Sequence, residues 1–82
     1  MERHLKTIEL GKETLYRLTL ESEPCVLGTQ KCRFVQFELL RYIAEDPAVT
    51  ACGTSDFHRM TMKHDGSHWI VEAEAIVKSQ SL

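Results

Sequence analysis

Residues 59–72 read RMTMKHDGSHWIVE, two alternating runs on either side of the dipeptide Asp65-Gly66. Asp-Gly between alternating runs is typical of a two-residue β-hairpin turn, which sets His64 opposite Ser67. The expected pairs are Met62 with Trp69 and Met60 with Val71 on an apolar face, and Lys63 with His68, Thr61 with Ile70 and Arg59 with Glu72 on a largely charged face. A shift by one residue would set Met60 against Glu72, so the pattern favours this register.

A second hairpin is predicted at the start of the chain, where β-compatible residues at 5–10 and 14–20 flank Gly11-Lys12. By the two-residue period, the apolar side chains that share one face of the second strand are Tyr16, Leu18 and Leu20. These side chains lie beside Ile8 and Leu10 only if the loop has an odd number of residues. We therefore expect the three-residue loop Gly11-Lys12-Glu13.

A helix is predicted from about Lys31 to Asp46, with Thr29 as its N-terminal cap and Pro47 as its stop. At 100° per residue, one arc collects the apolar side chains Cys32, Val35, Leu39, Tyr42 and Ile43. Phe34 and Phe37 fall outside this arc. Either the helix begins later than Lys31, or two aromatic rings stand partly exposed, which would indicate a partner.

These elements predict an α+β domain of four to five antiparallel strands in hairpin, helix, hairpin order, with one helix packed on one face of the sheet. A β-grasp arrangement uses the same order and is the alternative. Residues 48–52 are expected to form a short strand before a turn at residues 53–55. Because 82 residues are too few for two domains, we expect a single domain over 1–82, with a frayed tail at about 79–82.

Charge and composition favour neither nucleic acid nor a membrane as a partner. Ten Lys and Arg residues against twelve Asp and Glu residues give a net charge of -2, so no summed field attracts nucleic acid or an anionic membrane. No window approaches ~18 consecutive apolar residues, which argues against a membrane span. No apolar stretch follows the charged residues 2–6, and the cysteine count of three is odd, so we expect reduced thiols in the cytoplasm.

Residues of catalytic or metal-binding type occur without a recognisable signature. His58 and His64 lie on one strand roughly 20 Å apart, at ~3.3 Å per residue, and cannot share one ion within that strand. Three cysteines, Cys25, Cys32 and Cys52, contain no close pair of the zinc-finger kind. Cys52 and His58 are residues of the types that serve as nucleophile and base, but they form no recognisable catalytic signature. We therefore expect no metal, no cofactor, no catalytic residue and no enzymatic activity.

Residues 37–47, FELLRYIAEDP, are similar to the first helix of the winged-helix DNA-binding domains of response regulators. The resemblance implies a second helix, a recognition helix and a terminal hairpin whose Arg59, Lys63 and His68 would contact phosphate. Only about ten residues separate Pro47 from the final hairpin, which leaves no room for a recognition helix. Amphipathicity of a core helix explains the same eleven residues.

The favoured function is therefore a small non-enzymatic protein-protein interaction module, homodimeric and able to bind another protein. Its expected interface is the flank of the helix with Phe34 and Phe37, or a sheet edge, and the candidate contact residues are Phe34, Phe37, Arg41, Arg59 and Glu72. The alternatives are a nucleic-acid-binding regulator with a winged-helix-like hairpin, and a small metal-binding protein or enzyme.

Overall fold

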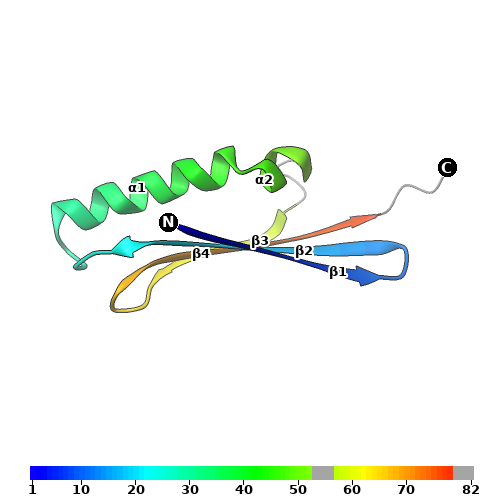
Figure 1. Ribbon diagram of the computed structural model, residues 1–82, viewed down its shortest axis with the longest axis horizontal. Helices are drawn as coiled ribbons and strands as arrows, with labels where there is room; N and C mark the ends of the chain where they lie inside the picture. Colours follow the sequence, from blue (N-terminus) through cyan, green and yellow to red (C-terminus); the bar gives the residue numbers. More distant parts are fainter. Residues whose placement is uncertain (53–56, 79–82) are drawn as a thin grey trace.

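The computed structural model describes residues 1–52 and 57–78, which form one four-stranded sheet with helices on one of its faces (Figure 1). The elements are β1 (Glu2–Leu10), β2 (Glu13–Pro24), α1 (Gln30–Glu45), α2 (Pro47–Cys52), β3 (Phe57–His64) and β4 (His68–Lys78). The strand order is β1-β2-β4-β3, and all neighbours are antiparallel. The predicted α+β class, with hairpin, helix, hairpin order, is confirmed. The expected turn at 53–55 and tail at 79–82 lie outside the described residues.

The loop of the first hairpin differs from the prediction. Leu10 pairs with Glu13, so the loop holds the two residues Gly11 and Lys12, and the expected three-residue loop is wrong. Gly11 has a φ of 70°, a left-handed conformation that closes a two-residue turn at no steric cost. The shorter loop moves Ile8 to the face opposite the core and sets Leu5 against Leu18.

The register of the second hairpin also differs from the prediction, by two residues. Met62 lies opposite Val71 instead of Trp69, and Arg59 lies opposite Glu74 instead of Glu72. The cause is the length of the connection between the strands. The first pair of the ladder is His64 with Trp69, and four residues lie between them in the sequence. The Asp65 carboxylate accepts hydrogen bonds from the backbone N–H groups of Ser67 and His68 at 2.8 and 2.9 Å. A shift of two residues keeps every side chain on its face, so the predicted division into two faces holds.

Helix α1 begins and ends where capping signals predict. Thr29 is the N-cap, and its hydroxyl accepts a hydrogen bond from the Cys32 N–H at 3.2 Å. The buried face consists of Cys32, Val35, Leu39 and Ile43, whereas Tyr42, which was expected inside, is exposed. Neither described helix combines the length and the apolar character that a membrane span needs.

Residues 48–52 form part of a second helix, α2, and the prediction of a strand is wrong. Asp46 acts as the cap, since its carboxylate accepts a hydrogen bond from the Ala48 N–H at 2.9 Å. Pro47 occupies the first helical position, where its missing N–H and restricted φ favour helix formation. The proline therefore both ends α1 and starts α2.

The core lies between the helices and one face of the sheet. Its main cluster is Leu18, Leu20, Leu39, Ile43, Val49, Val71 and Ala73, and a second cluster of Cys25, Cys32 and Val35 lies at the start of α1. Trp69 packs against both clusters. No described element covers the other face of the sheet, and the β1–β2 turn extends beyond the helices (Figure 1).

Candidate functional site

The five residues predicted for an interface lie on two separate surfaces. Phe34, Phe37 and Arg41 are on α1, opposite its buried arc, and the two rings are 62% and 66% exposed. By strand alternation, Arg59 and Glu72 lie on the uncovered face of the sheet, on the other side of the molecule. One contact surface cannot contain all five residues. The helix residues form one candidate site, and Arg59 and Glu72 are not part of it.

The outer face of α1, defined here as Phe34, Phe37, Glu38 and Arg41, is a shallow hollow with two aromatic rings and one charge of each sign. Phe34, Phe37 and Arg41 follow the i, i+3, i+7 spacing that aligns side chains along a helix. The Arg41 guanidinium lies 3.6 Å from the Glu38 carboxylate and 5.6 Å from the centre of the Tyr42 ring. The Phe34 and Phe37 rings therefore stand exposed beside an ion pair that is itself exposed and does not cover them.

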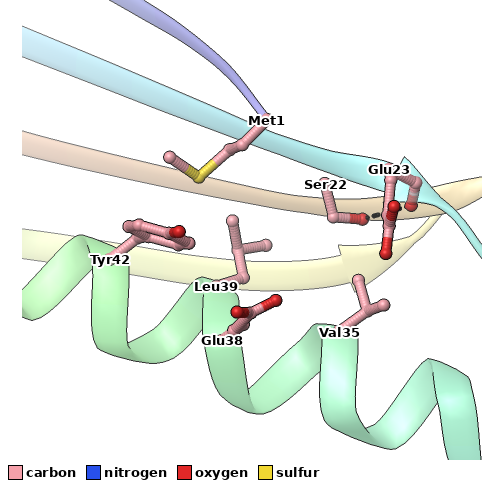
Figure 2. A pocket seen from close by; sticks show the side chains of 7 residues that line it. All are labelled: Met1, Ser22, Glu23, Val35, Glu38, Leu39 and Tyr42. Atoms are coloured by element: carbon pink, nitrogen blue, oxygen red, sulfur yellow. Dashed lines mark hydrogen bonds between the residues drawn. The ribbon is translucent and has the colours of Figure 1, made fainter.

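A cleft of about 170 Å³ separates the inner side of α1 from the end of β2 (Figure 2). Its lining is Met1, Ser22, Glu23, Val35, Glu38, Leu39 and Tyr42. Figure 2 shows Met1 reaching from the sheet toward Leu39 and Tyr42. Ligand sites usually measure ~300–1,000 Å³, so this cleft is too small for a substrate of ordinary size.

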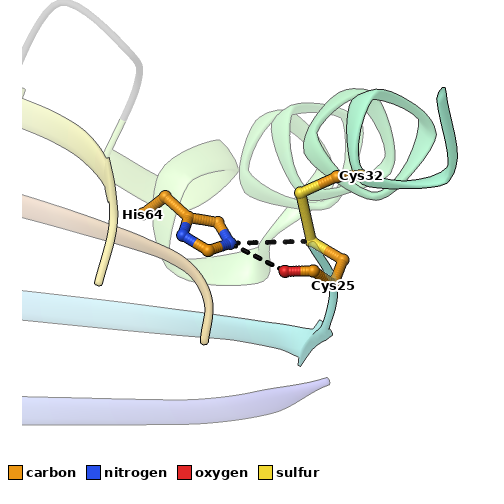
Figure 3. A group of neighbouring side chains, drawn as sticks. All are labelled: Cys25, Cys32 and His64. Atoms are coloured by element: carbon orange, nitrogen blue, oxygen red, sulfur yellow. Dashed lines mark hydrogen bonds between the residues drawn. A yellow bond between two sulfur atoms is a disulfide. The ribbon is translucent and has the colours of Figure 1, made fainter. Parts of the chain in front are cut away.

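A disulfide joins Cys25 to Cys32, and the expectation of reduced thiols is wrong for these two residues (Figure 3). Cys25 follows the last residue of β2, and its N–H donates to the Ser67 carbonyl at 2.9 Å. Cys32 lies in the first turn of α1, which brings the two Cα atoms to 5.1 Å. The separation of seven residues has no signature of its own. The strand end at Pro24 and the cap at Thr29 place the two cysteines on either side of one loop, and the packing of α1 on the sheet brings them together.

His64 and Trp69 surround the disulfide with N–H groups. His64 Nδ1 accepts a hydrogen bond from the Gly66 N–H at 3.1 Å, so in the neutral ring Nε2 carries the proton and donates to the Cys25 carbonyl at 2.9 Å. The same Nε2 lies 3.9 Å from Cys25 Sγ (Figure 3). Trp69 Nε1 donates to the carbonyl and to the sulfur of Cys32, at 3.1 and 3.2 Å. The two rings meet edge to face at 5.2 Å.

The ligand-type atoms of Cys25, Cys32 and His64 all lie within 4.8 Å of one another. In the disulfide state the two sulfurs are bonded to each other. The third ligand-type atom, His64 Nε2, carries a proton and therefore cannot bind a metal ion. Metal binding would therefore need reduction of the disulfide and the other tautomer of His64. The absence of a metal stays a prediction, as does the absence of catalysis by Cys52 and His58. The Cys52 side chain lies outside the described residues.

Two of the three residues implied by the winged-helix resemblance, Arg59 and His68, lie beside acidic side chains of the protein itself. Arg59 lies 3.9 Å from Glu74, and His68 Nε2 lies 3.1 Å from Glu21. Between α1 and β3, the described residues are Asp46 and the six residues of α2, and they contain no recognition helix. No protein-family model, curated protein or solved structure matches this chain. The geometry of the two sites is therefore the basis for the function.

Proposed function

We propose that this protein is a small non-enzymatic interaction module that forms a homodimer through the outer face of α1. The observation that carries the proposal is the exposure of Phe34 and Phe37, 62% and 66%, on the side of the helix opposite the core. Aromatic side chains contribute a large share of binding energy at protein interfaces, because each can remove ~150–250 Å² from water. Two adjacent rings left in solvent are therefore a candidate contact surface.

A second copy of the chain is the partner that the charges of this surface favour. The outer face holds one base, Arg41, and one acid, Glu38, beside the two rings, so the surface is complementary to itself. In an antiparallel pair of α1 helices related by a two-fold axis near Phe37, Arg41 of one copy faces Phe34 of the other. A guanidinium over a ring in this position is a favourable cation–π contact, and an isologous arrangement satisfies both copies equally.

Cytoplasmic location and binding of another protein belong to the same proposal. In the reducing cytoplasm the bond between Cys25 and Cys32 is subject to exchange, so its redox state varies with conditions. Neither the oxidised nor the reduced state of this bond changes the outer face of α1 directly, because Phe34 and Phe37 lie on the side of the helix away from Cys32.

The test compares the double variant Phe34→Ser, Phe37→Ser with the wild type by light scattering across a dilution series. The wild type is expected at twice the 9.4 kDa mass of the chain, and the double variant at the mass of one chain. The matched control is Leu10→Ser, Ile76→Ser, which removes two exposed apolar side chains from the uncovered face of the sheet and should leave the dimer intact.

Circular dichroism of both variants shows whether the fold is retained. A folded double variant that still dimerises would contradict the proposal. Loss of the dimer only in the control variant would move the interface to the uncovered sheet face. A monomeric wild type at all concentrations would reject self-association itself.

A further inference from the structure

We propose that Cys25 and Cys32 form a thiol–disulfide exchange site in which Cys25 is the sulfur attacked by an external thiol and Cys32 is the sulfur that leaves. The chemical class of the reactant is a dithiol, either a small molecule or a pair of cysteines on another protein. Because this site lies at the start of α1 and on the loop before it, it is separate from the dimer surface proposed above.

Access distinguishes the two sulfurs. Cys25 lines an open surface hollow together with Pro24, Val26, Leu27, His64, Gly66 and Ser67, whereas Cys32 is not part of that lining. Cys25 is 8% exposed and Cys32 is 1% exposed. Val26 and Leu27 are both exposed and form an apolar margin beside the sulfur. An approaching thiolate therefore reaches Cys25 Sγ, and Trp69 and the helix shield Cys32 Sγ.

Cys32 is the better leaving group, because its surroundings stabilise a thiolate. Its sulfur accepts a hydrogen bond from Trp69 Nε1 at 3.2 Å. The residue lies in the first turn of the 16-residue helix α1, where the helix dipole favours negative charge. Every residue of the first turn is among those that the structure describes, and none of them is acidic. Lys31 and Arg33 precede and follow Cys32 in the sequence. The hydrogen bond from Trp69 and the position in the first helical turn therefore point to the same sulfur.

The exchange balances in two steps. The thiolate of the dithiol attacks Cys25 Sγ and forms a mixed disulfide, while the bond between the two cysteines breaks and its electron pair goes to Cys32 Sγ. The second thiolate of the dithiol then attacks the first sulfur of the same dithiol, which is bonded to Cys25 in the mixed disulfide. Cys25 is displaced as a thiolate. The His64 N–H, 3.9 Å from Cys25 Sγ, is placed to donate to this thiolate. The dithiol is oxidised to a disulfide, and two electrons and two protons pass to the cysteine pair.

The chain contains its own reporter of this reaction. Trp69 is the single tryptophan of the sequence, and its indole N–H touches the sulfur that changes charge. We expect reduction by dithiothreitol to change the fluorescence of Trp69 while the far-ultraviolet circular dichroism stays that of the folded protein. All measurements use the Cys52→Ser chain, so that no third thiol takes part.

The decisive experiment compares Cys32→Ser, which keeps Cys25, with Cys25→Ser, which keeps Cys32. Each is reacted with oxidised glutathione, and the mixed disulfide is followed by intact mass. We expect the chain with Cys25 to react at least about tenfold faster, because the burial of Cys32 outweighs the greater stability of its thiolate. Equal rates, or a faster reaction of the chain with Cys32, would overturn the proposal. If either variant does not fold, mapping the glutathione adduct of the Cys52→Ser chain to Cys25 or Cys32 decides the same question.

Two further measurements separate the exchange site from other uses of the same residues. Trp69→Phe keeps an aromatic ring and removes the N–H, so reduction by dithiothreitol, followed by intact mass after alkylation of the free thiols, should slow about tenfold, the effect of one lost hydrogen bond to a charged group. An unchanged rate would overturn the role of Cys32 as the stabilised leaving group. A disulfide that reacts only after the chain unfolds would show a structural crosslink. Stoichiometric zinc retained by the reduced chain, measured with zinc alone, would replace the exchange site by a metal centre.

Discussion

Asp46 connects three elements, β1 and α2 through its carboxylate and α1 through its backbone N–H. Arg3 of β1 donates two hydrogen bonds to it at 2.7 and 3.0 Å, and the Ala48 N–H of α2 donates a third at 2.9 Å. Asp46 is also the C-cap of α1. The hydrogen bonds from Arg3 are the main reason why the pKa of Asp46 is lowered, and burial opposes this effect. The start of the chain is thereby tied to the junction between the two helices.

Asp46→Asn is expected to lower the free energy of unfolding at pH 7 by about 1–3 kcal/mol, toward the lower end because Arg3 is 39% exposed. Asparagine still caps α2, so the loss reports the contact with Arg3. A lowered pKa means that the stabilisation is present above the ordinary value of ~3.9 and is lost as the pH falls through the lowered one. Chemical denaturation between pH 7 and pH 2 should show the two proteins converging below about pH 4. A difference that does not change with pH would contradict this account.

At the residue scale, the sequence predicts the exposure and the capping role of side chains, because both depend on residues nearby in the chain. The exposure of Phe34 and Phe37 follows from their place on a helix, and the cap at Thr29 follows from its place before one. The ion pair of Arg3 and Asp46 joins residues 43 positions apart, and no local pattern indicates it.

At the scale of elements, the connection between β3 and β4 decides the register that the alternating pattern leaves open. Asp65-Gly66 favours a two-residue turn, yet the Asp65 side chain binds two backbone N–H groups and stabilises a four-residue connection. The same hydrogen bonds, from His68 first and then Ser67, lower the pKa of Asp65. Alternation fixes the face of each side chain, but registers that differ by two residues satisfy it equally.

Gly66→Ala tests the conformation of this connection. Gly66 has a φ of 98°, and a Cβ added there would meet nothing within 4 Å, so the cost is backbone strain alone. We expect the free energy of unfolding to fall by about 1–2 kcal/mol, as for other residues forced into the left-handed region. Gly66→Asn is the control and should lose less, because asparagine tolerates this region. Urea denaturation measures both, and an alanine variant as stable as the wild type would show that the turn has another conformation.

At the scale of the whole molecule, the chain is elongated and leaves more surface in water than a compact protein of its size. Its extents are 51 × 19 × 18 Å, and its radius of gyration of 14.3 Å exceeds the ~12 Å expected for 82 residues. The accessible surface of 5722 Å² exceeds the roughly 5,000 Å² expected for this mass. This excess follows from the elongated shape, since the β1–β2 turn extends beyond the helices (Figure 1).

The proposed dimer would make thermal stability depend on protein concentration. Association stabilises the folded state by mass action, so the Tm of the wild type should rise with each tenfold increase in protein concentration. The variant Phe34→Ser, Phe37→Ser should show a constant Tm over the same range. Differential scanning calorimetry measures both, and a wild-type Tm independent of concentration would argue for a monomer.

The sequence by itself determined which face the residues of β2, β3 and β4 occupy, where α1 begins and ends, and that Phe34 and Phe37 lie outside the buried arc of the helix. These properties depend on periodicity and on caps, which act over three or four residues. The tertiary structure decided both hairpin registers, the helical state of α2, the bond between Cys25 and Cys32, and the placement of His64 and Trp69 around it. His64 and Trp69 lie 39 and 37 residues along the chain from the cysteines they contact. Only the packing of α1 on the sheet brings such distant positions together.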